Sequence, residues 1–311
     1  MKYDKPMVIA IVGPTASGKS DVGVRLAKKI NGAIISGDSM QVYKRMDIGT
    51  AKPSEDELNE VEHHLIDVLE PTEEFNVSKY QALAHDAIMD ITSRGKVPIV
   101  VGGTGLYIDA LLKGFIFPDT GKSEEVREAL MQEGEEKGSI LLHERLTSVD
   151  SEAASKIHPN DLRRIIRALE VYMTSGKPIS EMQRMHDSTK LYRYQYFGLD
   201  VERESIRNKI DIRVDKMIEA GLIEEVKSLI DSGFAECIIS MQAIGYKELV
   251  RYFFGESTLD EAITHIKTET KKYAKRQMTW FKRSPDTMWM DANEPFDGER
   301  IATEIVGLLN I

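Results

Sequence analysis

Residues 7–20 read MVIAIVGPTASGKS, and this stretch decides the fold class. Its first six residues are a short apolar run, which is typical of a strand buried on both faces of a parallel sheet. Residues 13–20, GPTASGKS, match the complete pattern G-x-x-x-x-G-K-[ST] of the phosphate-binding loop, or P-loop, of nucleotide-binding proteins. Apolar residues at four-residue spacing follow from Ser20 to Ile30 and predict a helix. Strand, glycine loop and helix in this order indicate a phosphate site at the edge of an α/β sheet.

The chemistry of such a loop comes from its backbone and from two side chains. Its glycines let backbone N–H groups converge on an anion, and the following helix adds its dipole. Lys19 supplies a positive charge, and the Ser20 hydroxyl can hold Mg²⁺. A glycine turn without a ligand is the alternative, which the flanking strand and helix disfavour. The expected phosphate-binding residues are Gly13, Pro14, Thr15, Ala16, Ser17, Gly18, Lys19 and Ser20.

Two further apolar runs repeat this organisation. Residues 33–36 lead into GDSMQ (37–41), and residues 97–101 lead into GGTG (102–105), with a helical period over residues 80–92 between them. The repetition predicts an α/β fold, a P-loop-type parallel sheet core flanked by helices. Because the carboxyl ends of parallel strands share one edge, we expect the three loops to meet there.

The pattern changes after residue 117. Residues 119–190 show charge-rich helical segments without a strand signal, and YQYFGL (194–199) then reads as a strand that returns to the sheet. From Arg203 onward the chain is predicted to be mostly helical. Residues 1–117 and 191–311 are therefore expected to form the core, and residues 118–190 an all-helical insertion.

Composition narrows the functional classes. The chain has 311 residues, a formal net charge of -10 and one cysteine, which excludes a disulfide framework within the chain. No apolar run is long enough for a membrane span, so a cytoplasmic monomer that does not bind membranes is expected. The net charge argues against a nucleic-acid partner, unless the basic residues gather locally. Adjacent His63 and His64 have no third ligand nearby in sequence, and we predict no zinc site.

The loops after the second and third strands differ from those of a nucleotide hydrolase. Such enzymes place an acid at a neighbouring strand end to help hold Mg²⁺, whereas here that strand ends in GGTG. The backbone N–H groups and the Thr104 hydroxyl of this loop suit a second phosphate contact. Asp38 follows the other strand and could accept a proton from a nucleophile, although a turn or cap role is equally consistent with its position. The amide of Gln41 could read a base edge.

Two local clusters reverse the acidic net charge. Residues 267–283 contain seven Lys or Arg and one acid. Read as a helix, this segment has a basic side and a packed side; the basic side carries Lys272, Lys275, Arg276, Lys282 and Arg283, and the packed side carries Tyr273, Gln277, Trp280 and Phe281. A second cluster consists of Arg163, Arg164 and Arg167, opposite an apolar stripe. Such clusters are the electrostatic footprint of a polyanion, with an ordinary solvated helix as the alternative.

Arg213 lies at the border of an apolar helix face that spans residues 206–218. A cation that points inward needs an anion. Either a phosphate group or an internal carboxylate, such as Asp211 or Asp215, can provide it. The tendency of arginine to grip phosphate favours the first reading.

Six blocks, taken in chain order, resemble the bacterial tRNA dimethylallyltransferases. They are GPTASGKS (13–20), DSMQVYKRMDIGTAKP (38–53), GGTGLYIDAL (102–111), LRRIIRALEVY (162–172), IGYKE (244–248) and YAKRQMTWF (273–281). The resemblance spans nearly the whole chain, and the second and third blocks are its most specific parts. It implies transfer of a prenyl group from dimethylallyl diphosphate to N6 of adenosine 37 in tRNA, beside the anticodon, and it makes a diphosphate the ligand of the P-loop.

The resemblance also implies roles for individual residues. Asp38 becomes the general base, Thr104 a diphosphate contact near the tRNA base, and Arg213 a second clamp on the diphosphate. Mg²⁺ is expected at Ser20. The expected contacts to the anticodon stem-loop of tRNA are Asp38, Ser39, Met40, Gln41, Arg127, Arg163, Arg164, Arg167, Lys272, Lys275 and Arg276. The match for Arg127 is weaker, because its neighbours in sequence are not distinctive.

Three other functions share parts of this pattern. A small-molecule kinase would use the same loop with ATP, but GGTG and the basic clusters count against it. A prenyltransferase for free adenine nucleotides has no use for two separated basic clusters. An RNA-binding module without catalysis would not need intact Lys19, Ser20, Asp38 and Thr104.

Overall fold

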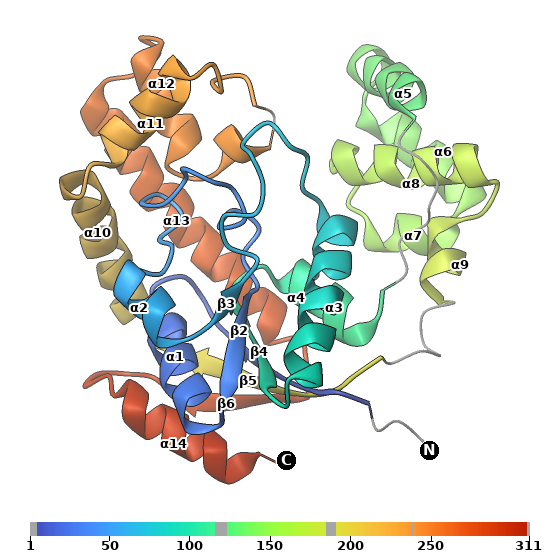
Figure 1. The fold of residues 1–311 in the computed structure, drawn as a ribbon. Coiled ribbons are helices and arrows are strands. Elements are labelled where there is room, and N and C mark those ends of the chain that lie inside the picture. The colour runs from blue at the N-terminus through green and yellow to red at the C-terminus, as the bar shows by residue number, and fades with distance from the viewer. Residues whose placement is uncertain (1–4, 116–122, 185–190, 238, 310–311) are drawn as a thin grey trace. The chain divides into compact units, whose positions relative to one another are not determined.

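The computed structural model describes residues 5–115, 123–184, 191–237 and 239–309 (Figure 1). The chain folds into two compact units, Met1–Leu112 with Leu191–Ile311, and Lys113–Lys190. The boundaries expected from sequence lie at residues 117–118 and 190–191. Of these positions, 117, 118 and 190 lie outside the described residues. Within the described residues, no helix is long and apolar enough to cross a membrane.

The first unit contains one six-stranded sheet, in the order β3-β2-β4-β1-β5-β6. Every neighbouring pair of strands is parallel. The strands are β1 (Met7–Val12), β2 (Gly32–Ser36), β3 (His63–His64), β4 (Val97–Gly102), β5 (Arg193–Asp200) and β6 (Thr287–Asp291). The predicted α/β class with a parallel sheet is confirmed, and β1, which leads into the P-loop, lies between β4 and β5.

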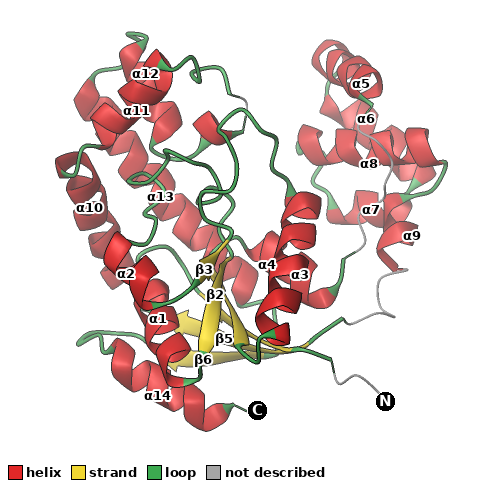
Figure 2. Ribbon diagram, in the orientation of Figure 1, coloured by secondary structure: helices red, strands yellow, loops and turns green. Residues whose placement is uncertain are grey.

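Helices lie on both sides of this sheet (Figure 2). Helices α1 and α14 pack against each other on one side, and α3 lies on the other. The helices of the first unit are α1 (Lys19–Lys29), α2 (Glu55–Glu60), α3 (Val77–Ser93), α4 (Gly105–Lys113), α10 (Arg203–Glu219), α11 (Leu222–Asp231), α12 (Tyr246–Phe253), α13 (Leu259–Phe281) and α14 (Gly298–Leu308), with a 3₁₀ turn at Ser240–Gln242.

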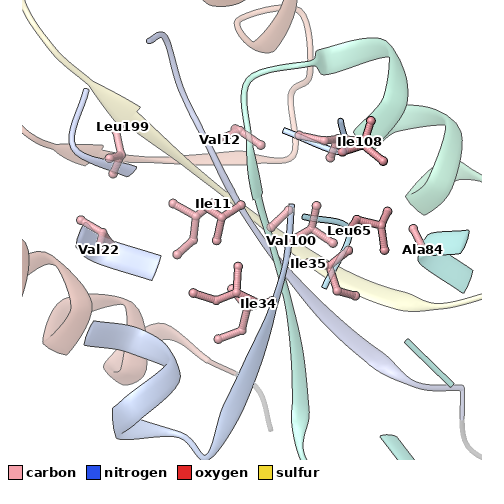
Figure 3. Close-up of a cluster of buried hydrophobic side chains, with 14 of the residues drawn as sticks. Ile11, Val12, Val22, Ile34, Ile35, Leu65, Ala84, Val100, Ile108 and Leu199 are labelled. Atoms are coloured by element: carbon pink, nitrogen blue, oxygen red, sulfur yellow. The ribbon is translucent and has the colours of Figure 1, made fainter. Parts of the chain in front are cut away.

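The core of the first unit is built on the two faces of the central strands. Aliphatic side chains of β1, β2 and β4, such as Ile11, Ile35 and Val100, meet residues from the covering helices (Figure 3). Burial on both faces of these central strands accounts for their continuous apolar runs in the sequence. The sheet is therefore a rigid base for the loops at its carboxyl edge.

The second unit is all helical in its described part. Its helices are α5 (Glu124–Lys137), α6 (Ser139–Val149), α7 (Ser151–Lys156), α8 (Leu162–Ser175) and α9 (Ile179–Arg184). It has a small core of its own, made by Leu130, Leu142, Leu146, Ala154, Ile165, Ile166, Ala168 and Leu169. The apolar stripe of α8 seen in sequence is the part that this core buries.

Two strands were not expected from sequence. Strand β3 is only two residues long, and β6 follows a basic helix in a region that the pattern predicted to be mostly helical. Strand β6 pairs with β5 at the edge of the sheet, and its burial is interrupted at Met288 and Trp289. A five-residue edge strand without a continuous apolar run gives little periodic signal.

Candidate active site

The three polar loops meet at the carboxyl edge of the sheet, as expected, and two of them are bonded directly to each other. The Thr104 backbone N–H donates to Gly37 O at 3.1 Å. The Ser39 N–H donates to Thr104 Oγ1 at 3.2 Å. A Cβ on Gly102 would collide with the Gly37 carbonyl, so only glycine permits this approach of the two loops. GDSMQ and GGTG therefore form one joined surface.

The P-loop connects β1 to α1 as its sequence predicts. Gly18 has φ +87°, a left-handed conformation that favours glycine, and α1 begins at the next residue. The Ser17 side chain is buried, and its Oγ has no hydrogen-bond partner among the described residues. A buried hydroxyl without a partner is costly, and a phosphate oxygen would satisfy it. Ser20, the expected Mg²⁺ ligand, is exposed at the start of α1.

Lys19 is held in this loop in an environment that disfavours its charge. Its Nζ donates to Pro14 O at 3.3 Å. Burial of its amino group is the main cause that lowers the pKa of Lys19 to about 8, repulsion from Arg213 lowers it further, and attraction to Asp38 opposes both. The amino group therefore stands to gain from a bound anion.

Arg213 reaches the same place from α10. Burial lowers the pKa of its guanidinium, and the charge of Asp38 acts in the opposite direction. The acids next to it in sequence are used elsewhere, because Asp211 pairs with Lys271 and Asp215 with Lys267, each at 2.6 Å. Across the described parts of the chain, no carboxylate forms an ion pair with Arg213. This arrangement supports the phosphate reading over the internal ion pair.

Arg213 borders a cavity of about 340 Å³ in the first unit. The P-loop contributes Thr15, and α13 contributes Tyr273 and Arg276. Asp38 and Arg213 face the cavity from the loop after β2 and from α10. The structure therefore brings together one carboxylate and two candidate phosphate-binding elements around a volume large enough for a small substrate group.

Asp38 makes the turn contact that its position in sequence allowed, and its side chain also faces the cavity. Its Oδ1 accepts a hydrogen bond from the Met40 N–H at 2.8 Å, which makes it a turn residue. The same side chain lines the cavity. Burial raises the pKa values of Tyr107 and Tyr273 to about 12, and the charge of Asp38 adds to the shift in both. Asp38 therefore acts electrostatically on both tyrosines.

Gln41 has its amide engaged inside the protein. Its Oε1 accepts from Ser36 Oγ at 2.8 Å. Its Nε2 donates to the carbonyls of Thr50 at 3.3 Å and Ala51 at 3.1 Å. In this arrangement Gln41 fixes the loop that carries Asp38, and reading a base edge would require these bonds to break.

A carboxylate that sequence reasoning did not single out holds the far part of the same loop. Glu225 of α11 accepts hydrogen bonds from the backbone N–H groups of Asp47, Ile48 and Gly49, at 2.9, 2.8 and 3.2 Å. It also accepts one from the Tyr246 hydroxyl at 2.6 Å. Its sequence neighbours resemble any solvated helix, so local patterns give no signal for this role.

The packed side of α13 also carries contacts to the site that were not foreseen. Tyr273 lies beside Thr104, and it lines the cavity. Gln277 contacts both phosphate-side loops, and Trp280 Nε1 donates to Asp109 Oδ2 at 2.8 Å. The sequence predicted these residues on the inward side of the helix, but an inward position alone does not distinguish a core residue from one that positions a site.

The basic side of α13 is only partly available for an external anion. Lys272 pairs with Glu269 at 2.7 Å, within its own helix. Lys275 is exposed, and Arg276 is exposed with its guanidinium 5.7 Å from the centre of the Tyr273 ring. Arg276 also lines the cavity, so this basic residue of α13 joins the surface to the candidate active site.

In the second unit, two of the expected RNA contacts share one buried acid. Arg127 and Arg167 both pair with Glu170 at 2.9 Å, and the Glu170 side chain is 1% exposed. Burial acts to raise the pKa of Glu170, but the hydrogen bonds from the two arginines lower it overall. Arg164 pairs with Asp161 at 3.3 Å, and Arg163 is exposed.

One group of possible metal ligands occurs beside β3, namely Glu62, His64 and Asp90. Arg94 pairs with Glu62 at 2.6 Å and with Asp90 at 2.7 Å. Hydrogen bonds from Arg94 and then Lys96 lower the pKa of Glu62 to about 2. The acids already have cationic partners, so this group has the character of an ion-pair network.

Comparison with known proteins identifies the family. The family model described as "IPP transferase" matches residues 41–284. A curated protein of Carboxydothermus hydrogenoformans, named tRNA dimethylallyltransferase, is 53% identical over 300 residues, which are 96% of each chain. A protein of Geobacillus thermodenitrificans with the same name is 51% identical over 96% of this chain and 93% of its own.

Solved structures agree with this match. A tRNA isopentenylpyrophosphate transferase of Bacillus halodurans has a TM-score of 0.73 at 44% identity, covering 98% of this chain and 95% of its own. A eukaryotic dimethylallyltransferase described as acting on tRNA has a TM-score of 0.83 at 31% identity, covering 97% of this chain and 77% of its own. Because sequence and fold agree over nearly the whole chain, this chain belongs to the IPP transferase family of prenyltransferases.

Proposed function

We propose that this protein transfers the dimethylallyl group of dimethylallyl diphosphate to N6 of adenosine 37 in tRNA and releases diphosphate. The observation that carries the proposal is the cavity in which Asp38 faces Arg213, beside Lys19 of the P-loop. Such a site can hold a leaving diphosphate and take up a proton within one small volume. The choice of tRNA follows the names of the relatives, and the choice of adenosine 37 follows the family resemblance.

The diphosphate would lie on the P-loop, with Lys19 and Arg213 as its cationic partners. Support comes from the pKa values of Lys19 and Arg213, both lowered by burial and both restored by a bound anion. The Ser17 hydroxyl without a partner offers a further donor, and Thr104 reaches the site from the joined GGTG loop. The Ser20 hydroxyl has the donor chemistry for Mg²⁺, which when bound would add positive charge to the leaving group.

The chemical step requires stabilisation of the leaving diphosphate, uptake of a proton from N6 and exclusion of water. The bond between C1 of the dimethylallyl group and the diphosphate oxygen breaks, and the diphosphate leaves with the electron pair. Adenine N6, a poor nucleophile, forms the new bond to C1 and loses a proton to the Asp38 carboxylate. Lys19 and Arg213 stabilise the negative charge that develops on the departing oxygens. The apolar lining of the cavity, which includes Val214, Met217 and Leu222, limits the water that could capture the allylic carbon.

The acceptor would enter as a base turned out of the anticodon loop. A base in an RNA loop can be splayed out at small cost, whereas a stacked base cannot reach a cavity at a strand edge. Arg276, which lines the cavity, and the exposed Lys275 are proposed as contacts to the RNA backbone near this base. Arg127, Arg163, Arg164 and Arg167 are proposed as further contacts on the second unit.

The test uses labelled substrate and a choice of acceptors. The protein is incubated with Mg²⁺ and dimethylallyl diphosphate labelled in the prenyl group, together with tRNA, the same tRNA carrying guanosine at position 37, or AMP. Label in the first tRNA alone is expected. Label in AMP alone would replace tRNA by a free nucleotide as the acceptor. In a parallel incubation that also contains ATP, turnover of ATP with no label transfer would favour the kinase reading.

A further inference from the structure

Helix α13 contacts both the P-loop and the GGTG loop through the side-chain amide of one residue, Gln277. Gln277 lies in the second half of α13 and is 5% exposed. Its Oε1 accepts from the backbone N–H of Thr15 in the P-loop at 2.8 Å. Its Nε2 donates to the carbonyl of Gly103 in GGTG at 3.1 Å. One side chain thus joins two loops that lie far apart in the sequence.

The space around this amide is closed. A Cβ on Gly103 would collide with Gln277 Nε2, so this position admits only glycine while the amide is there. A substitution that removed the amide would leave the Thr15 N–H and the Gly103 carbonyl without these partners, which is costly for buried groups. The two bonds therefore set the separation of the P-loop and GGTG.

Neighbouring turns of α13 hold the same loop. Tyr273, one turn before Gln277, lies beside Thr104. Trp280, one turn after it, lies against Gly105 so closely that a Cβ there would collide with the Trp280 ring. The residues at 273, 277 and 280 lie on one face of the helix, so this face of α13 lies against Gly103, Thr104 and Gly105.

We propose that Gln277 is a positioning residue that holds the diphosphate contacts of the P-loop and of Thr104 at their working separation. It does not line the cavity, and it acts through Thr15 and Gly103. The inference rests on the proposed function for the identity of the ligand, a diphosphate ester, while the bridge itself is independent of the acceptor.

The experiment separates positioning from folding. Inorganic diphosphate with Mg²⁺ is titrated calorimetrically into the protein and into Gln277→Met, which has a similar volume and lacks both hydrogen bonds. We expect diphosphate binding to weaken about tenfold, as expected for the loss of about 1.4 kcal/mol of preorganisation. In prenyl transfer, KM for dimethylallyl diphosphate should rise by a similar factor, while KM for tRNA stays unchanged.

The matched control is Gln81→Met. The side-chain amide of Gln81 also donates a hydrogen bond to a backbone carbonyl distant in sequence, that of Ala110 at 2.8 Å. Gln81 does not line the cavity. It should lower the thermal midpoint by a similar amount and leave diphosphate binding as in the unaltered protein. Equal losses of diphosphate affinity in both variants would overturn the proposal, because they would indicate general destabilisation.

A second pair of variants tests the bridge without relying on one substitution. Gly103→Ala should weaken diphosphate binding by displacing the amide, and in the background of Gln277→Ala it should have little further effect. If the two substitutions weaken diphosphate binding independently, so that their factors multiply in the double variant, the bridge would be refuted. If the unaltered protein binds diphosphate but labels no tRNA, the proposed function fails while the effect of Gln277 on diphosphate binding still decides this inference.

Discussion

The lowered pKa of Lys19 predicts that diphosphate binding weakens as the pH rises above about 8. Burial of the amino group, and repulsion from Arg213, disfavour the charged form in the free protein. The perturbation is the substitution Lys19→Met, compared with the unaltered protein over a range from about pH 7 to about pH 9, one unit either side of that pKa. The measured quantity is the ratio of the two dissociation constants for inorganic diphosphate, obtained by calorimetry at each pH.

The magnitude follows from the pKa shift. With a pKa of about 8, about nine tenths of the free protein carries a charged Lys19 at pH 7 and about one tenth at pH 9. If the charged form binds, the advantage of the unaltered protein over Lys19→Met should shrink about tenfold across this interval. The titration of diphosphate itself affects both proteins equally and cancels in the ratio.

The sign for stability is opposite to that of an ordinary ion pair. Lowering from 10.5 to about 8 means that a charged Lys19 destabilises the free fold by about 3 kcal/mol at pH below 8. This penalty is relieved as the pH rises from 8 to 10.5, because only the unfolded chain then keeps the proton. A bound diphosphate should abolish the penalty. As a control, Lys28→Met removes an exposed lysine from the same helix and should leave the binding profile unchanged. A ratio that stays constant across the whole interval would refute the reasoning.

Three further predictions concern other parts of the molecule. Asp38→Asn should lower the rate of prenyl transfer by about 10²–10⁴-fold and leave tRNA affinity, measured by filter binding, unchanged; near-normal turnover would remove Asp38 as the base. The pKa of Glu170 is lowered by its two arginines, so its pairing stabilises the fold above the unfolded pKa of about 4.3, and this contribution should disappear as the pH falls through the folded value. The denaturant midpoint of Glu170→Gln should therefore fall less steeply at acid pH than that of the unaltered protein. An equally steep fall would contradict the assignment. Gly102→Ala should destabilise the protein by about 1–3 kcal/mol in chemical denaturation, since its Cβ would meet the Gly37 backbone; wild-type stability would show that the loops can separate freely.

Features encoded within a few consecutive residues could be predicted from the sequence. The P-loop is one of these, because its strand, glycines and helix are adjacent and each has its own signal. The place of Asp38 at the end of β2 also follows from local pattern and from the rule that parallel strands share an edge. The parallel sheet itself is a consequence of the repeated units.

Contacts between distant segments could not be predicted. Gln277 meets Thr15 across 262 positions and Gly103 across 174, and only the packing of α13 brings them together. The same holds for Glu225, whose role depends on the loop after β2 folding over α11. For Gln41, the sequence motif suggests an amide that reads a nucleic-acid base. In the structure this amide forms hydrogen bonds with Ser36 and Ala51 of the protein itself, and sequence alone does not reveal these partners.

The contacts of α13 impose a fixed rotational phase on this helix. Each residue advances an α-helix by about 100°, so one residue inserted between positions 273 and 280 would turn Trp280 away from Gly105 while Tyr273 remained beside Thr104. Both contacts are made by residues inside the helix and not by the turns at its ends. An inserted or deleted residue should therefore be tolerated in the loops beside α13 and should disrupt the site when it lies within residues 273–280.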